Sequence, residues 1–324
     1  MNILLAEGDQ FESVDGSSIL DSALCADVVL EHSCKNGRCG VCKTKLLDGR
    51  VMVLRDQEAL SKKDVDAGYI LTCCCEAETN IQIDAANLEM FQKKEIRVCP
   101  ARISSLTELS DNIIQVTLRL PPTATFDFLE GQFVDVTWNG IKRSYSIASC
   151  SDEREIMLLI KRVEGGLMSD YWFGQAQVSD LLRIEGPKGT FVLRDKSAPI
   201  IFLATGTGIA PIRSILSKLE KHAELSHPIY LFWGNRSAAD FVWCGKFDNI
   251  VLKQIRILSQ ADECWSGDFG YVQDYVESNV DRPLYECQVY ACGSNEMIIA
   301  AKEKMLSLGV PEGKFFSDAF VQSS

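Results

Sequence analysis

Several cysteines have the type and spacing of ligands to an iron–sulfur cluster. Cys34, Cys39 and Cys42 stand in one short run, and a Cys-Cys-Cys triplet that begins at Cys73 follows later in the chain. Thiolates spaced C-x4-C-x2-C, with one distant cysteine, hold a [2Fe-2S] cluster. Glycines within the run allow a tight loop whose backbone N–H groups turn toward sulfur. Because such a cluster carries electrons, the first part of the chain is predicted to be an electron carrier.

A structural zinc site is the alternative, because any C-x-x-C pair can supply half of one. Zinc sites usually combine two such pairs, whereas three cysteines share one loop here, which favours the cluster. On spacing alone the fourth ligand stays open among Cys73, Cys74 and Cys75. The unused members of the triplet would be small buried residues, as free cysteines commonly are.

A second group of residues is suited to a flavin. Arg143, Tyr145 and Ser146 lie on one short segment and offer a cation for phosphate, a ring to stack on isoalloxazine and a hydroxyl near its reactive nitrogen. Gly166 and Ser169 follow at the start of a predicted helix, where backbone N–H groups can face a pyrophosphate. The two motifs in this order are more specific for a flavin than either one alone.

A glycine turn after an apolar strand favours a dinucleotide. Gly206, Thr207 and Gly208 follow the apolar segment 199–204 and open a helix with Pro211 in its first turn. The run departs from the G-x-G-x-x-G fingerprint, so by itself it indicates only a phosphate-binding turn.

The next apolar strand ends near residues that bear on the choice of nucleotide. Arg236 and Ser237 could bind the 2′-phosphate of NADPH, whereas Asp240 would repel it if its carboxylate faced the ribose. The motifs alone leave both NADH and NADPH open.

The elements that must position these motifs indicate three domains. Residues 1–92 read as a small β-rich α+β domain, β-grasp-like, with one helix at 19–26 and a last strand at 80–84. A polar linker, 93–99, leads into an antiparallel β-barrel at 100–196, predicted from strands near 114–120, 132–138 and 156–163. Residues 197–324 alternate strand, turn and helix, which predicts a doubly wound α/β domain.

Composition narrows the class of partner and the compartment. The 324-residue chain carries a net charge of −12, which argues against nucleic acid or an anionic membrane as partner. Residues 1–90 hold 8 Lys/Arg against 16 Asp/Glu, a net of −8, which serves either solubility or steering toward a basic redox partner. Thirteen cysteines, an odd number, and a start that lacks a signal-peptide pattern predict a cytoplasmic protein.

Taken together, the motifs resemble the ferredoxin–NADP reductase superfamily coupled to a plant-type ferredoxin module. The resemblance rests on Arg-x-Tyr-Ser, Gly-x-x-Ser, the run 186–191, Gly-Thr-Gly-Ile-Ala-Pro and Cys292-Gly-Ser. The whole chain is similar to iron–sulfur flavoprotein reductases that serve oxygenases and related enzymes. This family implies electron flow from NADH, with NADPH possible, through FAD and the [2Fe-2S] cluster to a protein partner. FAD is needed because hydride carries two electrons and the cluster accepts one at a time.

The resemblance also implies a role for each matching position. The phrase 70–73 matches the segment that delivers the last cluster ligand, which selects Cys73. Cys292 would lie beside the nicotinamide C4, and the less favoured alternative is a small residue that ends a buried strand. The remaining positions are Arg143 for FAD phosphate, Tyr145 for stacking, Ser146 near flavin N5, Gly166 and Ser169 for the FAD pyrophosphate, Gly206, Thr207 and Gly208 for the nicotinamide dinucleotide, and Asp318 with Phe320 near the flavin.

Further phrases are similar to one subfamily of these reductases, notably the segments 70–74, 120–124, 182–187 and 314–321. Its members supply electrons to a pyridoxamine-phosphate-dependent dehydrase during C-3 deoxygenation of CDP-4-keto-6-deoxyglucose. This reaction is a step toward the 3,6-dideoxyhexoses of bacterial O-antigen. This likeness favours NADH. The alternative is the reductase component of an aromatic-ring or di-iron oxygenase. A hypothesis of another class is a redox sensor that binds nucleotide without turnover.

Overall fold

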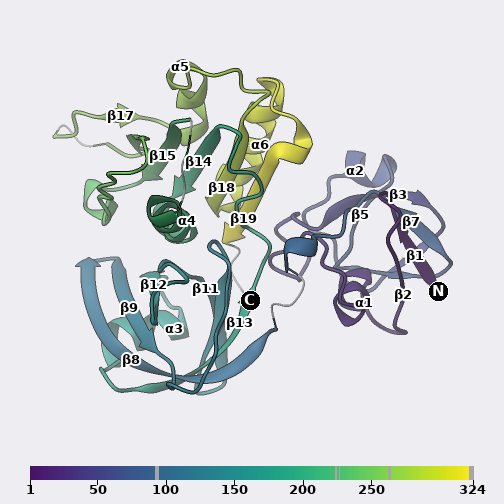
Figure 1. The fold of residues 1–324 in the computed structure, drawn as a ribbon, viewed down its shortest axis with the longest axis horizontal. Coiled ribbons are helices and arrows are strands. Elements are labelled where there is room, and N and C mark those ends of the chain that lie inside the picture. The colour runs from purple at the N-terminus through teal and green to yellow at the C-terminus, as the bar shows by residue number, and fades with distance from the viewer. Residues whose placement is uncertain (92–94, 223–224, 226, 262–263, 321–324) are drawn as a thin grey trace. The chain divides into compact units, whose positions relative to one another are not determined.

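The structure is a computed structural model that describes residues 1–91, 95–222, 225, 227–261 and 264–320. It divides into two compact units, Met1–Lys94 and Glu95–Ser324 (Figure 1). Within the described ranges, every helix is too short or too polar to span a lipid bilayer.

The first unit is built on a mixed five-stranded sheet in which β1 pairs with β7 in parallel. The helix α1 (Ile19–Cys25) is capped by Ser18, whose side chain accepts a hydrogen bond from the Asp21 N–H, and it buries Ile19 and Leu20 in the core. This helix ends one residue before the predicted 19–26. The sheet order is β2 (Gln10–Glu12), β1 (Asn2–Leu5), β7 (Ile81–Ile83), β3 (Lys43–Asp48) and β5 (Tyr69–Leu71); a separate pair is formed by β4 (Val51–Val53) and β6 (Cys75–Ala77).

Two short helices complete the first unit. α2 (Lys62–Asp66) begins with a capping box. The Asp64 N–H donates to the Ser61 hydroxyl, and the Ser61 N–H donates to the Asp64 carboxylate. The 3-10 turn η1 (Glu89–Phe91) precedes the connection to the second unit.

The second unit begins with a six-stranded antiparallel barrel. Its interior is filled by alternate residues of each strand, such as Val134 and Val136 of β10, as the period of two requires. A β-bridge joins Ile147, the residue after β11, to Leu158 of β12, and it closes the barrel between these two edge strands. The strand order is β11 (Ile141–Ser146), β10 (Phe133–Trp138), β13 (Leu181–Lys188), β8 (Arg97–Ser110), β9 (Ile113–Arg119) and β12 (Glu155–Lys161).

A six-stranded parallel sheet makes up the rest of the second unit. Its order is β17 (Asp268–Phe269), β16 (Leu252–Leu258), β15 (Ile229–Asn235), β14 (Ile200–Thr205), β18 (Gln288–Ser294) and β19 (Phe315–Phe320). Successive strands extend to one side from β14, and the chain then returns to add β18 on the other side. In open α/β sheets, ligands bind at the carboxyl ends of the strands where the order reverses. The switch point here lies between β14 and β18.

Helices connect the strands of this sheet. The longest are α4 (Ile209–His222) after β14 and α6 (Asn295–Ser307) after β18. Shorter pieces are η3 (Gly206–Gly208), η4 (Ala238–Asp240), η5 (Val272–Tyr275), α5 (Val276–Asn279) and η6 (Glu312–Lys314).

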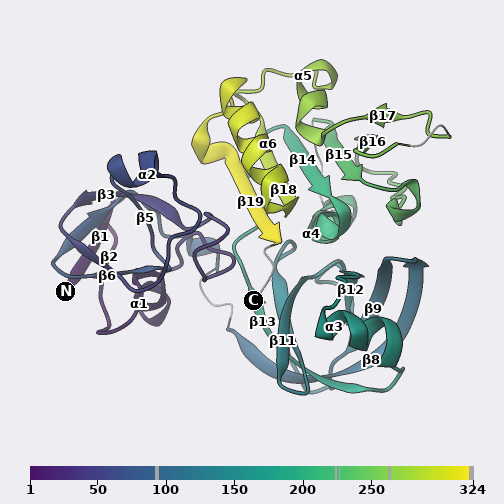
Figure 2. The same ribbon diagram turned by 180° about the vertical axis from the view of Figure 1, so that it is seen from behind.

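The barrel and the parallel sheet meet along α4, which borders the barrel in both views (Figure 1, Figure 2). The Ser214 hydroxyl donates to the carbonyl of Ser149 at 2.6 Å, and Lys218 pairs with Asp152 at 2.7 Å. Because α4 starts directly after the glycine turn, these contacts tie the position of that turn to the barrel.

The predicted fold class, an α+β domain, an antiparallel barrel and a doubly wound sheet, is confirmed. The predicted linker 93–99 overlaps the start of the first barrel strand. β8 begins at Arg97, because the alternating residues of this segment pair with β13 from Gly186↔Arg97 onward, and residues 93 and 94 lie outside the described part of the chain.

Candidate functional site

The cysteine loop of the first unit is shaped by residues with left-handed backbone. Gly37 has a φ of +84°, and a side chain there would lie 2.3 Å from the carbonyl oxygen of Asp56 and 2.8 Å from the Cys74 sulfur. The Ala59 N–H donates to the Gly37 carbonyl at 2.9 Å, so the neighbouring segment covers the loop. Only glycine fits at this position, as expected for a cradle around a compact group.

The four predicted ligands lie as two pairs of thiols. Cys42 and Cys73 are 3.3 Å apart between their sulfurs, and Cys34 and Cys39 share a hydrogen bond. Among the described residues, no three His, Cys, Asp or Glu side chains are arranged around a single metal ion. Two pairs suit two iron atoms bridged by sulfide and do not suit one tetrahedral zinc ion.

The loop also favours thiolate in each pair. Hydrogen bonding by the Cys39 thiol, with backbone N–H groups from Asn36 and Cys39, lowers the pKa of Cys34 to about 5. In the second pair the Cys42 thiol lowers the pKa of Cys73 to about 7. The partners Cys39 and Cys42 have raised pKa values because each donates to its neighbour and is buried. Thiolate is the form that binds metal, so one thiol of each pair is poised for it, and the pairing of the sulfurs fits the cluster.

The other two members of the triplet point elsewhere. The Cys74 sulfur lies 3.5 Å from the Asp56 carbonyl oxygen and 3.6 Å from the Cys73 sulfur, and the Cys75 sulfur lies 3.4 Å from Gln57 Oε1. All three cysteines are buried. The geometry therefore favours Cys73 as the fourth ligand.

In the barrel, β11 carries the residues predicted to bind a flavin. Arg143 and Tyr145 are two residues apart, so their side chains lie on the same face of β11. Ser146 is the last residue of the strand and is buried. The Tyr145 hydroxyl accepts a hydrogen bond from the indole N–H of Trp172 at 2.9 Å. Burial raises the pKa of Tyr145 to about 12, so the phenol keeps its proton at neutral pH.

The glycine-rich segment after β12 forms a compact turn. Gly165 has a φ of +70°, and Gly166 is the N-cap of the four-residue helix α3 (Leu167–Asp170). The Ser169 hydroxyl accepts the Val163 N–H at 2.8 Å. Ser169 thus shapes this turn, and its own hydroxyl proton is left to donate.

The predicted dinucleotide turn lies at the switch point of the parallel sheet. Gly206 has a φ of +56°, and its carbonyl accepts the Trp233 indole N–H at 3.0 Å. A side chain on Gly208 would lie 2.1 Å from the carbonyl oxygen of Cys292. The glycine turn therefore packs directly against the end of β18.

Three predicted residues from distant parts of the second unit meet beside this turn. Asp318 of β19 is the register partner of Cys292 of β18, and the Ser146 hydroxyl of the barrel donates to Asp318 Oδ2 at 3.5 Å. Burial, and secondarily the Asp318 carboxylate, raise the pKa of Cys292, which therefore stays a neutral thiol. Phe320 lies two residues beyond Asp318 on the same strand and is 40% exposed.

The sequence reading missed a contact between the two halves of the second unit. Lys161, at the end of β12, forms an ion pair at 3.7 Å with Asp240, and its Nζ lies 3.6 Å from the position of a Cβ on Gly206. Asp240 is only 3% exposed and also accepts the Ser110 hydroxyl at 3.0 Å. The carboxylate therefore faces Lys161 and Ser110 of the barrel. The available signal was a lysine near the end of the predicted strand 156–163, shortly before Gly165.

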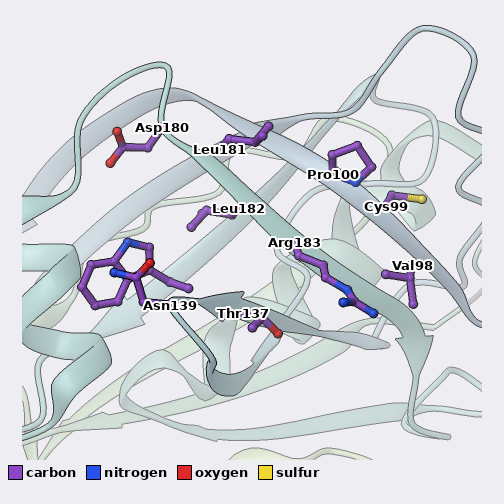
Figure 3. A pocket seen from close by; sticks show the side chains of 10 residues that line it. Val98, Cys99, Pro100, Thr137, Asn139, Asp180, Leu181, Leu182 and Arg183 are labelled. Atoms are coloured by element: carbon purple, nitrogen blue, oxygen red, sulfur yellow. The ribbon is translucent and has the colours of Figure 1, made fainter.

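A shallow groove on the barrel surface, about 610 Å³ in volume, lies apart from these residues (Figure 3). Exposed Val98 and Leu181 line it together with Asp180 and Arg183. Among its described lining residues are none of the predicted site positions. Open volume alone therefore does not locate the chemistry in this fold.

Comparison with known families agrees with a division of the chain into three domains. The chain matches models for a 2Fe-2S iron-sulfur cluster binding domain at residues 4–78, an oxidoreductase FAD-binding domain at 100–193 and an oxidoreductase NAD-binding domain at 202–303. The three matched domains define an oxidoreductase with a [2Fe-2S] cluster, FAD and a nicotinamide nucleotide as cofactors. The predicted cofactors and the enzyme class are confirmed, and the sensor hypothesis is set aside.

Relatives of full length narrow the family. The CDP-6-deoxy-L-threo-D-glycero-4-hexulose-3-dehydrase reductase of Yersinia pestis is 37% identical, covering 97% of this chain and 96% of its own. The toluate 1,2-dioxygenase electron transfer component of Pseudomonas putida is 28% identical, with 95% and 94% covered. A cytochrome P450 reductase structure from Amycolatopsis has the same fold, with a TM-score of 0.74, 23% identity and all of both chains covered. The chain belongs to the family of iron–sulfur flavoprotein reductases that includes the dehydrase reductase.

Proposed function

We propose that this reductase passes electrons from NADH to a pyridoxamine-phosphate-dependent dehydrase in the C-3 deoxygenation of CDP-4-keto-6-deoxyglucose. This is the activity of CDP-6-deoxy-Δ3,4-glucoseen reductases, also called CDP-4-dehydro-6-deoxyglucose reductases. The observation that carries the proposal is the 37% identity to the dehydrase reductase over nearly both whole chains, against 28% to the dioxygenase component at similar coverage. The dehydrase would use the electrons to complete 3,6-dideoxyhexose formation for O-antigen.

The proposed roles of the residues follow from their positions. Bound FAD supplies the change from two-electron to one-electron chemistry. Ser146, Asp318 and Cys292 would form a buried pocket at the switch point, where they orient the reacting rings. Phe320 would cover the flavin from the end of β19. The remaining assignments are Arg143 for FAD phosphate, Tyr145 for stacking, and Gly166 with Ser169 for the FAD pyrophosphate.

The nicotinamide nucleotide would bind the glycine turn, and we propose NADH as the physiological donor. Gly206, Thr207 and Gly208 bring backbone N–H groups to the start of α4, a position suited to a pyrophosphate. NADPH is the alternative donor, because Arg236 is exposed and Asp240 pairs with Lys161 of the barrel.

The cluster ligands and the compartment complete the proposal. Cys34, Cys39, Cys42 and Cys73 would hold the cluster in the ferredoxin domain, residues 1–92, and domains 100–196 and 197–324 would hold FAD and NADH. The odd number of cysteines, thirteen, supports a cytoplasmic location where thiols stay reduced.

A coupled assay tests the choice of acceptor. The reconstituted chain is mixed with NADH and one of two acceptors: the dehydrase with its CDP-sugar substrate under anaerobic conditions, or a dioxygenase with its aromatic substrate in air-saturated buffer. We expect C-3 deoxygenated sugar with the dehydrase and negligible hydroxylation with the dioxygenase. Absence of deoxygenated sugar, in the presence of normal cytochrome c reduction by the same preparation, would refute the assignment of the dehydrase. The same assay with NADPH compares the two nucleotides.

A further inference from the structure

An aromatic cluster backs the strand that carries Tyr145. Trp172 is 2% exposed, and its indole N–H donates to the Tyr145 hydroxyl at 2.9 Å. The two rings are 6.1 Å apart between centroids and nearly perpendicular, at 82°. Both residues contribute to the packing of the barrel core.

The position of Trp172 depends on an unusual turn. Residues Tyr171–Gln175 form a π-helix, and the Ala176 N–H donates to the Tyr171 carbonyl at 2.8 Å. π turns are rare and are frequent at functional sites. Tyr171 is held in place on its other side, because its hydroxyl donates to Asp180 at 3.0 Å. The turn begins immediately after α3, so the segment predicted to bind a pyrophosphate also delivers Trp172.

Two separate restraints act on the Tyr145 ring. The hydroxyl lies on the axis about which the ring flips, so the hydrogen bond fixes the direction of the side chain but not the ring plane. The perpendicular indole of Trp172 then restricts the plane, since edge-to-face packing is lost when the ring rotates. A stacking residue held in one orientation loses less conformational freedom when its ligand binds.

We propose that Trp172 is a positioning residue that fixes both the direction and the plane of the Tyr145 ring for stacking on the isoalloxazine. The inference rests on the proposed placement of the flavin against Tyr145. In this arrangement the segment from Gly166 through the π turn has two roles, because its first part shapes the pyrophosphate turn and its second part orients the stacking ring. The simpler alternative is that Tyr145 merely satisfies a buried indole N–H, which would affect folding stability but not the flavin.

The experiment measures the bound flavin itself. FAD is added to flavin-free Trp172→Phe and Tyr145→Phe variants and to the double variant, and the Kd and the visible circular dichroism of bound flavin are recorded. Loss of one neutral hydrogen bond should raise the Kd for FAD about fivefold. Because both single variants remove the same bond, the Kd of the double variant should be close to the higher of the two single-variant Kd values.

Two further variants control the test. Trp138→Phe alters a ring that stacks on Tyr171 at 4.2 Å rather than on Tyr145, and it should keep the wild-type flavin spectrum. Tyr145→Ala removes the stacking ring altogether. If Tyr145→Ala changes the flavin spectrum and Trp172→Phe leaves both spectrum and Kd as in wild type, the positioning role is wrong. If Tyr145→Ala also changes nothing, the placement of the flavin is wrong and the inference fails with it. Thermal melting of each apoprotein shows whether a variant acts on folding alone.

Discussion

Substitution of Gly208 by alanine should slow reduction of the flavin by NADH. The added Cβ would lie 2.1 Å from the carbonyl oxygen of Cys292, 2.6 Å from its carbonyl carbon and 2.9 Å from the nitrogen of Gly293. All three are backbone atoms near the end of β18, so no side chain can rotate away. A carbon–oxygen contact needs roughly 3.3 Å, and the glycine turn and β18 must therefore separate by roughly 1 Å.

This displacement falls on the two segments proposed to hold the nicotinamide. A misplacement of about 1 Å costs on the order of 100-fold in rate, which corresponds to about 2.7 kcal/mol of activation free energy. Anaerobic stopped-flow absorbance of the Gly208→Ala variant, mixed with saturating NADH, measures the rate of flavin bleaching. The spectra of oxidised flavin and cluster should stay as in wild type, because their predicted ligands lie on other segments.

Gly313→Ala is the matched control. A Cβ there meets no heavy atom within 4 Å, and the residue lies in a short turn before β19. Its bleaching rate should equal that of wild type. A Gly208→Ala rate within about threefold of wild type would refute the argument, because it would mean that the close approach of the turn to β18 does not govern the geometry of transfer.

Three further outcomes follow from the geometry. Cys73→Ser should lose the native low-temperature EPR spectrum of the reduced cluster, whereas Cys74→Ser should keep it, since the Cys73 sulfur is the one 3.3 Å from its Cys42 partner. Asp240→Asn should lower the free energy of unfolding by about 1–2 kcal/mol in urea titrations, and the NADH to NADPH rate ratio should change by less than about threefold because the carboxylate faces Lys161. Two lysines lower the pKa of Glu185 from 4.5 to about 2, so its stabilising effect is complete above pH 4.5 and is lost as pH falls through about 2. Glu185→Gln should therefore cost about 1 kcal/mol at pH 7, after allowance for partial exposure, and almost nothing near pH 2.

Each of these outcomes has a contrary result. A native spectrum in Cys73→Ser would assign the fourth ligand to another cysteine of the triplet. A large change in nucleotide preference in Asp240→Asn would show that this carboxylate reaches the bound ribose. A stability difference for Glu185→Gln that stays constant from pH 7 to pH 2 would show that its ion pairs contribute nothing to folding.

Local patterns made most of the fold predictable. The alternation near 114–120 and 132–138 predicted β9 and β10, and the apolar run before Gly206 predicted β14. These predictions were possible because strand periodicity and turn chemistry are properties of neighbouring residues. The same holds for the cysteine loop, where Gly37 is required by its left-handed backbone. The π turn after α3 escaped prediction, since a helix pattern does not distinguish an i→i+5 bond from the usual one.

The sequence by itself determined the chemistry of this protein: the thiols and their spacing, the flavin-binding strand and the glycine turn. These signals are local, because ligand spacing and backbone freedom are written in adjacent residues. Only the tertiary structure paired Cys73 with Cys42, turned Asp240 toward Lys161, and set Ser146 beside Asp318. Those contacts join positions far apart in the chain, so they depend on strand register and on the packing of α4 against the barrel, which no short segment encodes.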